Sequence, residues 1–558
     1  MARNRATHVQ DESAWQPAPH ERSPIPGSPP TPWHPPGRRI AYLLVGTLVV
    51  MAGALGNALV TANLVNLQGS LGLYQAEIQW LPTVYVMTNV CASMLLFKVR
   101  QQFGIRPFTQ LFLIAFALMT GGHLLVHSFA SAIAVRALSG IAGSALSTVG
   151  LLYIVQASTP ALRLKSLVLA ITLPQLAVPL ARLFPTGAFD ADHWQAMYLF
   201  ELALALFCLM GVRALPLPPV ERVRSFERLD FITFPLFAMG MALFVAVLGM
   251  GRVLWWFEAH WIPWALLGAG VLIPAALVIE HYRANPLLNT RWLGSGDILR
   301  FSLVSILVRV TLSEQTIGAT GLLTTVGMGP EQFRTLYAVV LAATILGTVV
   351  SVLTIDPQFL GRPILISLGL IGIGALLDAQ STNLTRPHDM YFSQALMGFC
   401  TALFIGPAML VGLTRAMRYG PTHFVSFSAL FSITQNLGGA AGSAAFGTFQ
   451  VIRERAHSAS ITQALSLADP LVAGRVQANA AAYGHVVADP ALLRAEGAAL
   501  LAQTATREAN ILAYNDVFLA VAVIAFGTMI WASMHIMRIR RENLARAREQ
   551  QNGSNANG

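Results

Sequence analysis

The sequence predicts an all-α polytopic membrane protein with fourteen membrane-spanning helices. Apolar stretches recur from residue 40 to residue 537, and each has about the twenty residues that a helix needs to cross a hydrocarbon core about 30 Å thick. Hydrophobic residues make up 55% of the 558 residues and charged residues only 11%, against roughly 25% charged residues in a soluble domain. The stretches are continuous rather than alternating, which favours helices over a β-barrel.

The predicted spans form a first set of six, a pair and a second set of six. The first set lies at 40–65, 78–97, 108–128, 130–157, 164–185 and 195–215. The pair lies at 230–250 and 260–281, and the second set at 301–326, 333–355, 363–379, 390–413, 424–450 and 512–537. The chain is thus divided into a disordered tail (1–39), an N-terminal six-helix bundle (40–215), two extra helices with their loops (216–290), a C-terminal six-helix bundle (291–537) and a second tail (538–558).

Charge placement predicts which side of the membrane the termini occupy. Lys and Arg favour short cytoplasmic loops, and most of the 36 basic residues fall in the termini or in loops that share their side. Both termini are therefore expected in the cytoplasm, and segment 1–39 is Pro-rich without the apolar region of a signal peptide. The exception is the long, Ala-rich loop 451–511, which we expect outside because long loops cross regardless of charge. Its composition predicts amphipathic helices that cover the outer mouth, meet a partner or form an uninvolved cap.

Several classes of function are disfavoured by composition and by missing motifs. The net charge of +10 is spread over loops and termini rather than along one stripe, which argues against nucleic acid. Cys91, Cys208 and Cys400 lie far apart without metal-ligand spacing, so no metal or cofactor is expected. The sequence has no phosphate-binding loop of an ATPase, no catalytic triad and no His-Glu-x-x-His. It therefore predicts a protein that is no enzyme and that uses an ion gradient or the substrate itself as its energy source.

Five short motifs occur in order along the chain. They are Trp80 with Tyr85 in the second span, residues 103–106 after it, 136–143 in the fourth span, 193–200 before the sixth and 435–439 in the thirteenth. In this order they resemble the signatures of the 14-span drug:proton antiporters of the major facilitator superfamily, the EmrB/QacA-like multidrug efflux transporters. The resemblance covers about residues 40 to 540, and the long loop before the last span is typical of the EmrB-like subgroup.

The resemblance implies the major facilitator fold, with two six-helix bundles and two extra central helices. A cavity between the bundles opens alternately to either side of the inner membrane of a bacterium. The implied activity is secondary active transport, exporting hydrophobic or amphipathic compounds such as drugs by proton antiport. The implied partners are a periplasmic adaptor protein and an outer-membrane channel, which the loop 451–511 would meet.

Three positions depart from the family's signatures. Ala58 stands where the family has an Asp in the first span, and Gln101 or a neighbour stands where it has the Asp of the loop signature. Residues 178–182 retain little of the antiporter signature of the fifth span. Because the first-span Asp is missing, a proton-independent facilitator or a substrate sensor of the same fold is the alternative. A membrane enzyme or scaffold is a third reading, and no motif supports it.

Three ionisable residues within spans are the candidates for proton coupling, because such groups usually mark a substrate or proton path. Glu314 in the ninth span is the first, since burial favours the neutral form of a carboxyl group; the alternative is a hydrated Glu at the span's end. Glu201 in the sixth span either shares this role or reaches the interface. Arg136 matches the family's signature Arg, implicated there in proton transfer, and is expected to pair with Glu201 or with polar groups of the first span, or to serve only as an anchor between spans.

Polar residues in the spans are also the candidates for lining the substrate cavity. They are Arg309, Gln315, Arg182, Asn57, Asn63, Tyr85, Asn89, Gln175, Gln435 and Asn436. Arg309 and Glu314 are about 140° apart around a helix, which argues against a direct pair. Arg182 either places a cation beside the central route or reaches the outer surface. Asn and Gln also hydrogen-bond between packed helices, so about half of these residues are expected to serve packing alone.

Glycine pairs predict where the helices pack most closely. Gly140 with Gly143 and Gly53 with Gly56 each form a small-residue face. Such faces let two helices approach and slide during alternating access.

Overall fold

The computed structural model describes residues 21, 28–184, 195–220, 222 and 225–556, and every regular element in this part of the chain is helical. The predicted all-α fold is thereby confirmed. The helices belong to two compact units. The first unit comprises the described residues up to Ile306 together with Leu341–Ile364 and Thr401–Leu437, and the second comprises Leu307–Val340, Leu365–Cys400 and the described residues from Gly438 onward.

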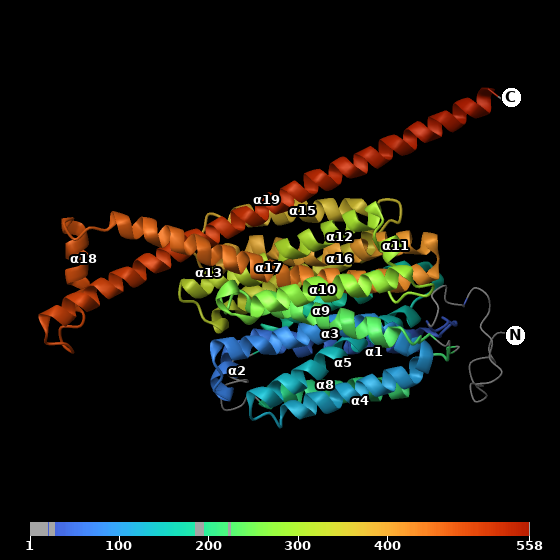
Figure 1. Cartoon of the computed structure of the whole chain (residues 1–558), viewed down its shortest axis with the longest axis horizontal. Coiled ribbons are helices and arrows are strands. Elements are labelled where there is room, and N and C mark those ends of the chain that lie inside the picture. The colour runs from blue at the N-terminus through green and yellow to red at the C-terminus, as the bar shows by residue number, and fades with distance from the viewer. Residues whose placement is uncertain (1–20, 22–27, 185–194, 221, 223–224, 557–558) are drawn as a thin grey trace. The chain divides into compact units, whose positions relative to one another are not determined.

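Most of the helices are labelled in Figure 1. Up to residue 293 they are α1 (Pro36–Ala62), α2 (Leu64–Leu71), α3 (Gln75–Phe103), α4 (Ile105–His123), α5 (Phe129–Gln156), α6 (Arg163–Thr172), α7 (Ala177–Ala181), α8 (Gln195–Ala214), α9 (Asp230–Met250), α10 (Trp261–Tyr282) and α11 (Thr290–Leu293). Those that follow are α12 (Gly296–Leu312), α13 (Thr320–Thr325), α14 (Arg334–Thr354), α15 (Gly361–Asp378), α16 (Tyr391–Tyr419), α17 (Pro421–Ala464), α18 (Pro470–Ala481) and α19 (Pro490–Ala556). Shorter turns include the 3-10 turn η2 (Leu173–Leu176) and one turn of π-helix, η5 (Gln315–Ala319).

Twelve helical segments of the described chain are long and apolar enough to cross a bilayer. The chain is therefore a multi-pass membrane protein. Two of the fourteen predicted spans, 301–326 and 424–450, have no counterpart among the twelve. The first is interrupted, because α12 ends after 17 residues and leads through η5 into α13. The second lies within α17, whose apolar character is diluted by Gln435, Asn436 and a run of small residues.

Close contacts among α1, α3 and α5 build the core of the first unit. A Cβ on Gly140 would lie 2.1 Å from Thr88 Oγ1, and a Cβ on Gly143 would lie 2.2 Å from the Tyr85 hydroxyl. No side chain larger than hydrogen fits at either position without a shift of α3. The close packing predicted for Gly140 and Gly143 is confirmed.

Local chemistry sets several helix boundaries. α1 begins at Pro36, where a missing amide donor costs no hydrogen bond and the fixed φ suits the first turn. α5 follows a capping box in which the hydroxyl groups of Ser128 and Ser131 accept from each other's backbone amides at 3.3 Å and 3.1 Å. Gly104 joins α3 to α4 with a φ of +86°, a region that glycine adopts without strain.

The described residues just before α1 pack against the first unit. The side-chain amide of Gln156 donates to the Pro30 carbonyl at 2.7 Å, and the His34 ring lies 3.3 Å from the Gln156 side-chain oxygen. Arg39 donates to the Ala157 carbonyl at 2.8 Å. The predicted disordered tail therefore does not extend through residues 28–39, because polar groups at the end of α5 satisfy this Pro-rich segment. Residues 1–20 and 22–27 of the predicted tail lie outside the described residues.

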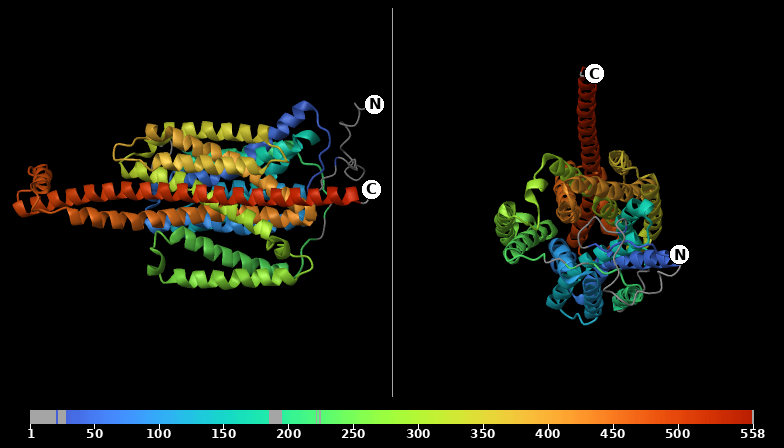
Figure 2. Two further views of the ribbon diagram at one scale, coloured as in Figure 1. Left: turned by 90° about the horizontal axis from the view of Figure 1, so that it is seen from above. Right: turned by 90° about the vertical axis from the view of Figure 1, so that its right-hand side faces the viewer.

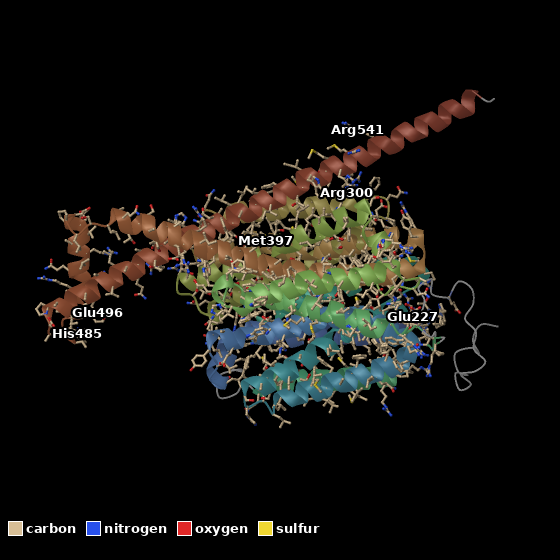
Figure 3. The ribbon with its side chains drawn as sticks, viewed as in Figure 1. Glu227, Arg300, Met397, His485, Glu496 and Arg541 are labelled. Carbon is tan, nitrogen blue, oxygen red and sulfur yellow. The ribbon has the colours of Figure 1, made fainter. Side chains whose placement is uncertain are left out.

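The predicted loop 451–511 is largely helical, as its composition predicts, but it is not a separate segment between two spans. α17 continues to Ala464 and α19 begins at Pro490, with α18 between them. Within the second unit these parts extend away from α13 and α15, with His485 and Glu496 near the far end (Figure 3). Arg453 of α17 donates to Asp516 of α19 at 2.6 Å, which ties the two long helices together.

Helices α9 and α10 lie side by side in the first unit (Figure 1 and Figure 2). A Cβ on Gly240 of α9 would lie 2.7 Å from Ile273 Cγ1 of α10. α9 also packs on α3, where a Cβ on Gly249 would lie 2.4 Å from Thr83 Oγ1. These two helices coincide with the pair predicted at 230–250 and 260–281.

Candidate functional site

Arg136 lies in the interior of the first unit, where its side chain is 1% exposed. Its guanidinium donates to the Gly56 carbonyl at 3.1 Å and to Asn57 Oδ1 at 2.6 Å, both on α1. It also lies over the ring of Tyr85, 4.7 Å from the centroid. Of the two partners considered for Arg136, the polar groups of the first span are the observed ones. The arginine thus joins α5, α1 and α3 at one point.

Other polar residues predicted near this point tie helices together. The Asn89 side chain donates to the Gly140 carbonyl of α5 at 3.1 Å, and the Tyr85 hydroxyl donates to the Gly53 carbonyl of α1 at 3.3 Å. Asn63 donates to a carbonyl of its own helix at 2.9 Å. Amide and hydroxyl groups satisfied in this way contribute to helix packing.

Glu201 of α8 faces the same turn of α1 as Arg136. Its side chain is 3% exposed, and Oε2 lies 3.7 Å from the position of a Cβ on Gly56. Among the described residues Oε1 has no hydrogen-bond partner. Because the side chain is buried, the alternative of an interfacial Glu201 does not hold. The acid and the arginine therefore converge on one turn of α1.

The predicted fifth span is one continuous helical segment over Pro160–Ala181 that tightens into a 3-10 turn in its middle. The 3-10 turn η2, which contains Pro174 and Gln175, separates α6 from α7, and proline interrupts a helix because it donates no amide hydrogen bond. Arg182 follows the last residue of α7 and is half-buried. Gln175 thus lies in the 3-10 turn of this span and Arg182 at its end.

The second unit contains a polar cluster, which we call the carboxylate cluster, formed by Glu314, Asp378, Ser393 and Gln394. The Gln394 side-chain amide donates to Glu314 Oε1 at 3.1 Å and to Asp378 Oδ2 at 2.8 Å. The Ser393 hydroxyl donates to Asp378 Oδ1 at 2.5 Å. Glu314 is 0% exposed and Asp378 is 3% exposed. One amide group therefore bridges two buried carboxyl groups.

Glu314 lies directly before the π-helical turn η5. Single π-helical turns inside helices are frequent at functional sites. The turn η5 also contacts α19. A Cβ on Gly318 of this turn would lie 2.6 Å from the Phe518 ring of α19 and 3.3 Å from Glu314 Oε1. Protein encloses the carboxyl group, so the alternative of a hydrated Glu at a span's end does not hold.

The carboxylate cluster has no cationic partner within the described residues. The hydrogen bonds to its carboxyl groups come from the amide of Gln394 and the hydroxyl of Ser393, which are neutral. Two carboxyl groups so close together in a low-dielectric interior cannot both stay ionised without a cation. A bound proton would balance the charge of such a pair in place of a cation.

Arg309 and Gln315 lie close to the carboxylate cluster in sequence but differ in their contacts. Arg309 Nε is buried without a hydrogen-bond partner among the described residues and lies 3.6 Å from the position of a Cβ on Gly439 of α17. Gln315 donates to the Gln394 carbonyl at 3.4 Å. Gln315 thus borders the cluster, whereas Arg309 contacts α17.

Gln435 and Asn436 of α17 belong to the first unit. Both polar atoms of the Gln435 side chain are buried and have no partner among the described residues. Asn436 donates to the Ser432 carbonyl of its own helix at 3.0 Å. A buried amide without partners is a place where water or a ligand would be expected, so Gln435 remains a candidate for the cavity.

Sequence reasoning missed Asp378, Ser393 and Gln394. Asp378 is the last residue of α15, and an acid at the end of a span looks like the polar boundary of that span. The available signal was the adjacent pair Ser393 and Gln394 inside an otherwise apolar span. Of the five sequence motifs, the first part of the fourth, including His193 and Trp194, lies outside the described residues.

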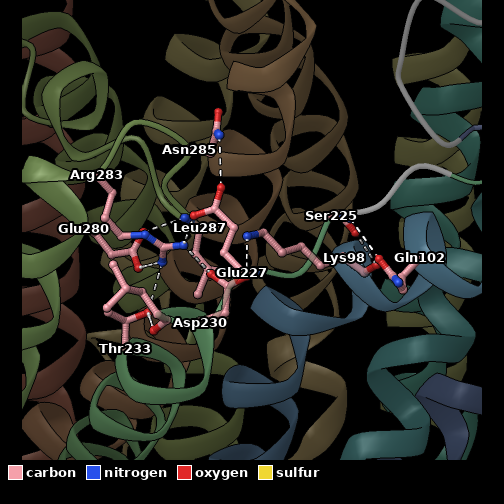
Figure 4. A network of polar contacts seen from close by, with 11 residues as sticks. Lys98, Gln102, Ser225, Glu227, Asp230, Thr233, Glu280, Arg283, Asn285 and Leu287 are labelled. Carbon is pink, nitrogen blue, oxygen red and sulfur yellow. Dashed lines mark hydrogen bonds and ion pairs between the residues drawn. The ribbon is translucent and has the colours of Figure 1, made fainter.

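A second polar cluster, which we call the ion network, joins the ends of α3, α9 and α10 in the first unit (Figure 4). Arg283 pairs with Glu280 at 2.6 Å, with Asp230 at 2.8 Å and with Glu227 at 2.9 Å. Lys98 pairs with Asp230 at 2.7 Å. Every carboxylate of this network therefore has a cationic partner.

The ion network also shifts the pKa values of Arg283 and Glu227, which lie outside the spans. Desolvation disfavours the charged form of Arg283, but its hydrogen bonds with Glu227, Asp230 and Glu280 outweigh this and raise its pKa. The hydrogen bond from Arg283 lowers the pKa of Glu227. Both shifts favour the ionised forms of Arg283 and Glu227, so these two groups stay charged at neutral pH.

Bilayer-length helices that enclose buried, hydrogen-bonded ionisable groups define the class of polytopic membrane transporters. The sequence profile of the Major Facilitator Superfamily matches residues 45–443. The chain belongs to the Major Facilitator Superfamily, whose members are transporters and not enzymes. No curated protein matches the sequence significantly.

Solved structures support the same fold. The proton:xylose symporter XylE bound to 6-bromo-6-deoxy-D-glucose is 14% identical, with a TM-score of 0.51 over 88% of this chain and 96% of that chain. The human organic anion transporter MFSD10 (TETRAN) is also 14% identical, with a TM-score of 0.53 over 88% of this chain and 100% of that chain. At this level of identity the similarity concerns the fold alone.

Proposed function

We propose that the protein is a secondary active transporter that exports hydrophobic or amphipathic compounds in exchange for protons. The observation that carries the proposal is the carboxylate cluster, in which Gln394 bridges the buried Glu314 and Asp378. Two carboxyl groups without a cation hold a proton while they are enclosed. When alternating access hydrates them, the ionised form becomes favourable and the proton leaves.

The surroundings of Glu314 support a site that changes its exposure. The π-helical turn η5 interrupts the regular hydrogen bonding of the helix directly after Glu314. A Cβ on Gly318 would lie 2.6 Å from the Phe518 ring of α19, and a Cβ on Gly321 would lie 2.5 Å from the Tyr514 hydroxyl. Contacts of this kind, in which a glycine has no side chain to interlock with the neighbouring helix, let one helix slide along another.

We extend the proposal to the topology that the resemblance implies. The interrupted segment from α12 to α13 and the first part of α17 would cross the membrane in addition to the twelve segments, which gives fourteen spans. The bundles would then comprise residues 40–215 and 291–537, with the extra pair in 216–290. Both termini would lie in the cytoplasm, and the membrane would be a bacterial inner membrane. A periplasmic adaptor protein and an outer-membrane channel would meet the segment 451–511.

The choice of substrate rests on the resemblance to EmrB/QacA-like drug exporters. Arg309, Gln315, Gln435, Asn57 and Gln175 are the side chains that we propose for contact with substrate. Arg182, Asn63, Tyr85, Asn89 and Asn436 complete the proposed lining.

The experiment is transport of a fluorescent lipophilic compound into proteoliposomes with an imposed pH gradient. We expect the wild-type protein to accumulate the compound against its concentration gradient, and Glu314→Gln to abolish the accumulation. The matched control is Asp297→Asn, which removes an exposed carboxylate from α12 whose partner is Arg300, 3.3 Å away. The control should accumulate the compound as the wild type does.

A proton-independent facilitator or substrate sensor is the second candidate, favoured by Ala58 at the place of the family's first-span Asp. In that case the compound equilibrates without regard to the pH gradient, and Glu314→Gln changes nothing. Accumulation that survives Glu314→Gln would instead assign proton coupling to another group.

A further inference from the structure

A second pair of buried groups lies between α4 and α8 in the first unit. His123 is the last residue of α4, and its ring lies flat on the ring of Tyr198, with centroids 4.3 Å apart and an interplanar angle of 10°. Tyr198 and Glu201 are three residues apart on α8 and so share one face of that helix. The stacking therefore brings the imidazole of His123 to the helix face that carries Glu201.

The hydrogen bond of His123 decides what its other nitrogen can do. Nδ1 lies 3.0 Å from the Met119 carbonyl oxygen, which can only accept a hydrogen bond, so Nδ1 carries the hydrogen. In the neutral ring Nε2 is then an acceptor. His123 is 3% exposed, and among the described residues Nε2 is buried without a partner.

Glu201 offers the complementary atom. Its Oε1 is likewise buried and without a hydrogen-bond partner in the described part of the chain. A protonated carboxyl oxygen is a donor and Nε2 is an acceptor, so each can satisfy the other. Two unmade hydrogen bonds in one interior are costly, and buried polar groups are rarely left in that state.

The other charged and titratable groups around Glu201 have contacts of their own. Arg136 of α5 donates to the Gly56 carbonyl and to Asn57. Tyr85 of α3 donates to the Gly53 carbonyl of α1. Tyr198 lies one turn before Glu201 and stacks on His123. None of these contacts uses Glu201 Oε1 or His123 Nε2.

We propose that the protonated carboxyl group of Glu201 donates a hydrogen bond to His123 Nε2, directly or through one buried water, and that this pair holds an exchangeable proton. In the exchange the proton leaves Glu201 Oε1 and binds Nε2, which gives a carboxylate and an imidazolium and keeps the bond from Nδ1 to Met119. The proposed hydrogen bond does not depend on the proposed function, whereas its role in transport rests on the proposed proton antiport. His123 is then a proton-binding residue of the first unit.

The test is infrared difference spectroscopy of the protein in lipid, which detects the C=O stretch of a protonated carboxyl group. We expect the wild-type protein to show a band that Glu201→Gln removes. His123→Phe retains a ring to stack on Tyr198 but offers no acceptor, so the band should move to higher wavenumber, as for a carboxyl group with a weaker hydrogen bond. His123→Gln returns an acceptor and should move the band back toward its wild-type position.

Two results would overturn the proposal. Absence of any band sensitive to Glu201→Gln would mean that Glu201 is ionised. A band that Glu201→Gln removes but His123→Phe leaves in place would mean that the acid has another acceptor.

The spectroscopic test is independent of transport. If the pair is present but the wild-type protein does not accumulate substrate against its gradient, the proposed antiport fails and the hydrogen bond stands. If accumulation occurs and the pair is absent, the antiport stands and this proposal fails.

Discussion

The ion network and the carboxylate cluster use the same kinds of side chain with opposite results. In the ion network two cations, Arg283 and Lys98, form ion pairs with three carboxylates, Glu227, Asp230 and Glu280. In the carboxylate cluster two acids share a neutral amide and have no cation among the described residues.

The difference lies in whether a proton is needed to balance the site. A paired network has a fixed charge and resists change, because removing one partner leaves an unpaired buried charge. For a pair of acids without a cation, protons would supply the balance, and in the proposed mechanism they enter and leave with hydration. The first arrangement suits a rigid joint between helices and the second suits exchange.

The largest expected effect concerns exchange at the carboxylate cluster. Asp378→Asn should lower the initial rate of export driven by a pH gradient by about a hundredfold, at the low end of the effects of removing a proton-transferring group. In this variant the amide oxygen accepts from Gln394, and the amide NH2 group donates to the Ser393 hydroxyl, which itself donates to the Met390 carbonyl at 3.0 Å. The unfolding temperature in detergent should therefore stay close to that of the wild type. A large fall in unfolding temperature with intact proton coupling would mean that the carboxylate cluster serves stability, as the ion network does.

The next effect concerns stability at the ion network. Arg283→Met leaves buried carboxylates without their main partner and should reduce the free energy of unfolding by about 3–5 kcal/mol. The control Arg300→Met removes an arginine whose i,i+3 pair with Asp297 is exposed, and should cost less than about 1 kcal/mol. Thermal unfolding in detergent measures both. Equal effects of the two variants would mean that the ion network does not stabilise the contact between its helices.

A smaller effect tests the packing around the carboxylate cluster. In Gly318→Ala the new methyl group would meet the Phe518 ring and Glu314 Oε1, which should cost about 1–3 kcal/mol by overpacking and slow gradient-driven export. Gly270→Ala is the control, because no atom lies within 4 Å of a Cβ at that helical position. It should leave the free energy of unfolding unchanged or raise it by up to about 1 kcal/mol. Identical behaviour of the two variants would contradict the close contact with α19.

The smallest effect is the pH dependence of the ion network. The hydrogen bond from Arg283 lowers the pKa of Glu227 below its unfolded value, so its contribution is complete above the ordinary carboxyl pKa and is lost as the pH falls through the lowered pKa. The side chain is 41% exposed, so the contribution should be under about 1 kcal/mol. Unfolding temperatures between neutral and acidic pH should fall less in Glu227→Gln than in the wild type. Equal slopes would show that Glu227 is not linked to folding.

The all-α fold and several helix contacts could be predicted from the sequence, because a lipid bilayer restricts the length and composition of the segments that cross it. Each span must be long and apolar, which made most helices visible, and Gly140 and Gly143 were recognisable as a close-packing face. Glu314 stood out as an acid inside an apolar stretch. The partners of Arg136 were narrowed to two sets, and the structure selects Asn57 with the Gly56 carbonyl.

Other features depend on contacts between distant segments and so were not predictable. Asp378 and Gln394 meet Glu314 only because α15, α16 and η5 come together in the second unit. The sequence does not predict the continuation of α17 to Ala464, because the polar residues after 450 indicate the end of a span. A helix outside lipid does not need an apolar composition. The end of α17 is stabilised by packing on α19, and such packing cannot be read from composition.

The unbroken helix α19 has a mechanical consequence. Its 67 residues at 1.5 Å each amount to a rod about 100 Å long, roughly three times the thickness of a bilayer's apolar core. The part near Tyr514 and Phe518 touches the segment that follows Glu314. If the rod stays straight, a tilt of about 5° there displaces a point 50 Å away by about 4 Å. A small tilt of α19 where it touches the segment after Glu314 would thereby become a displacement of several ångströms at the ends of α19.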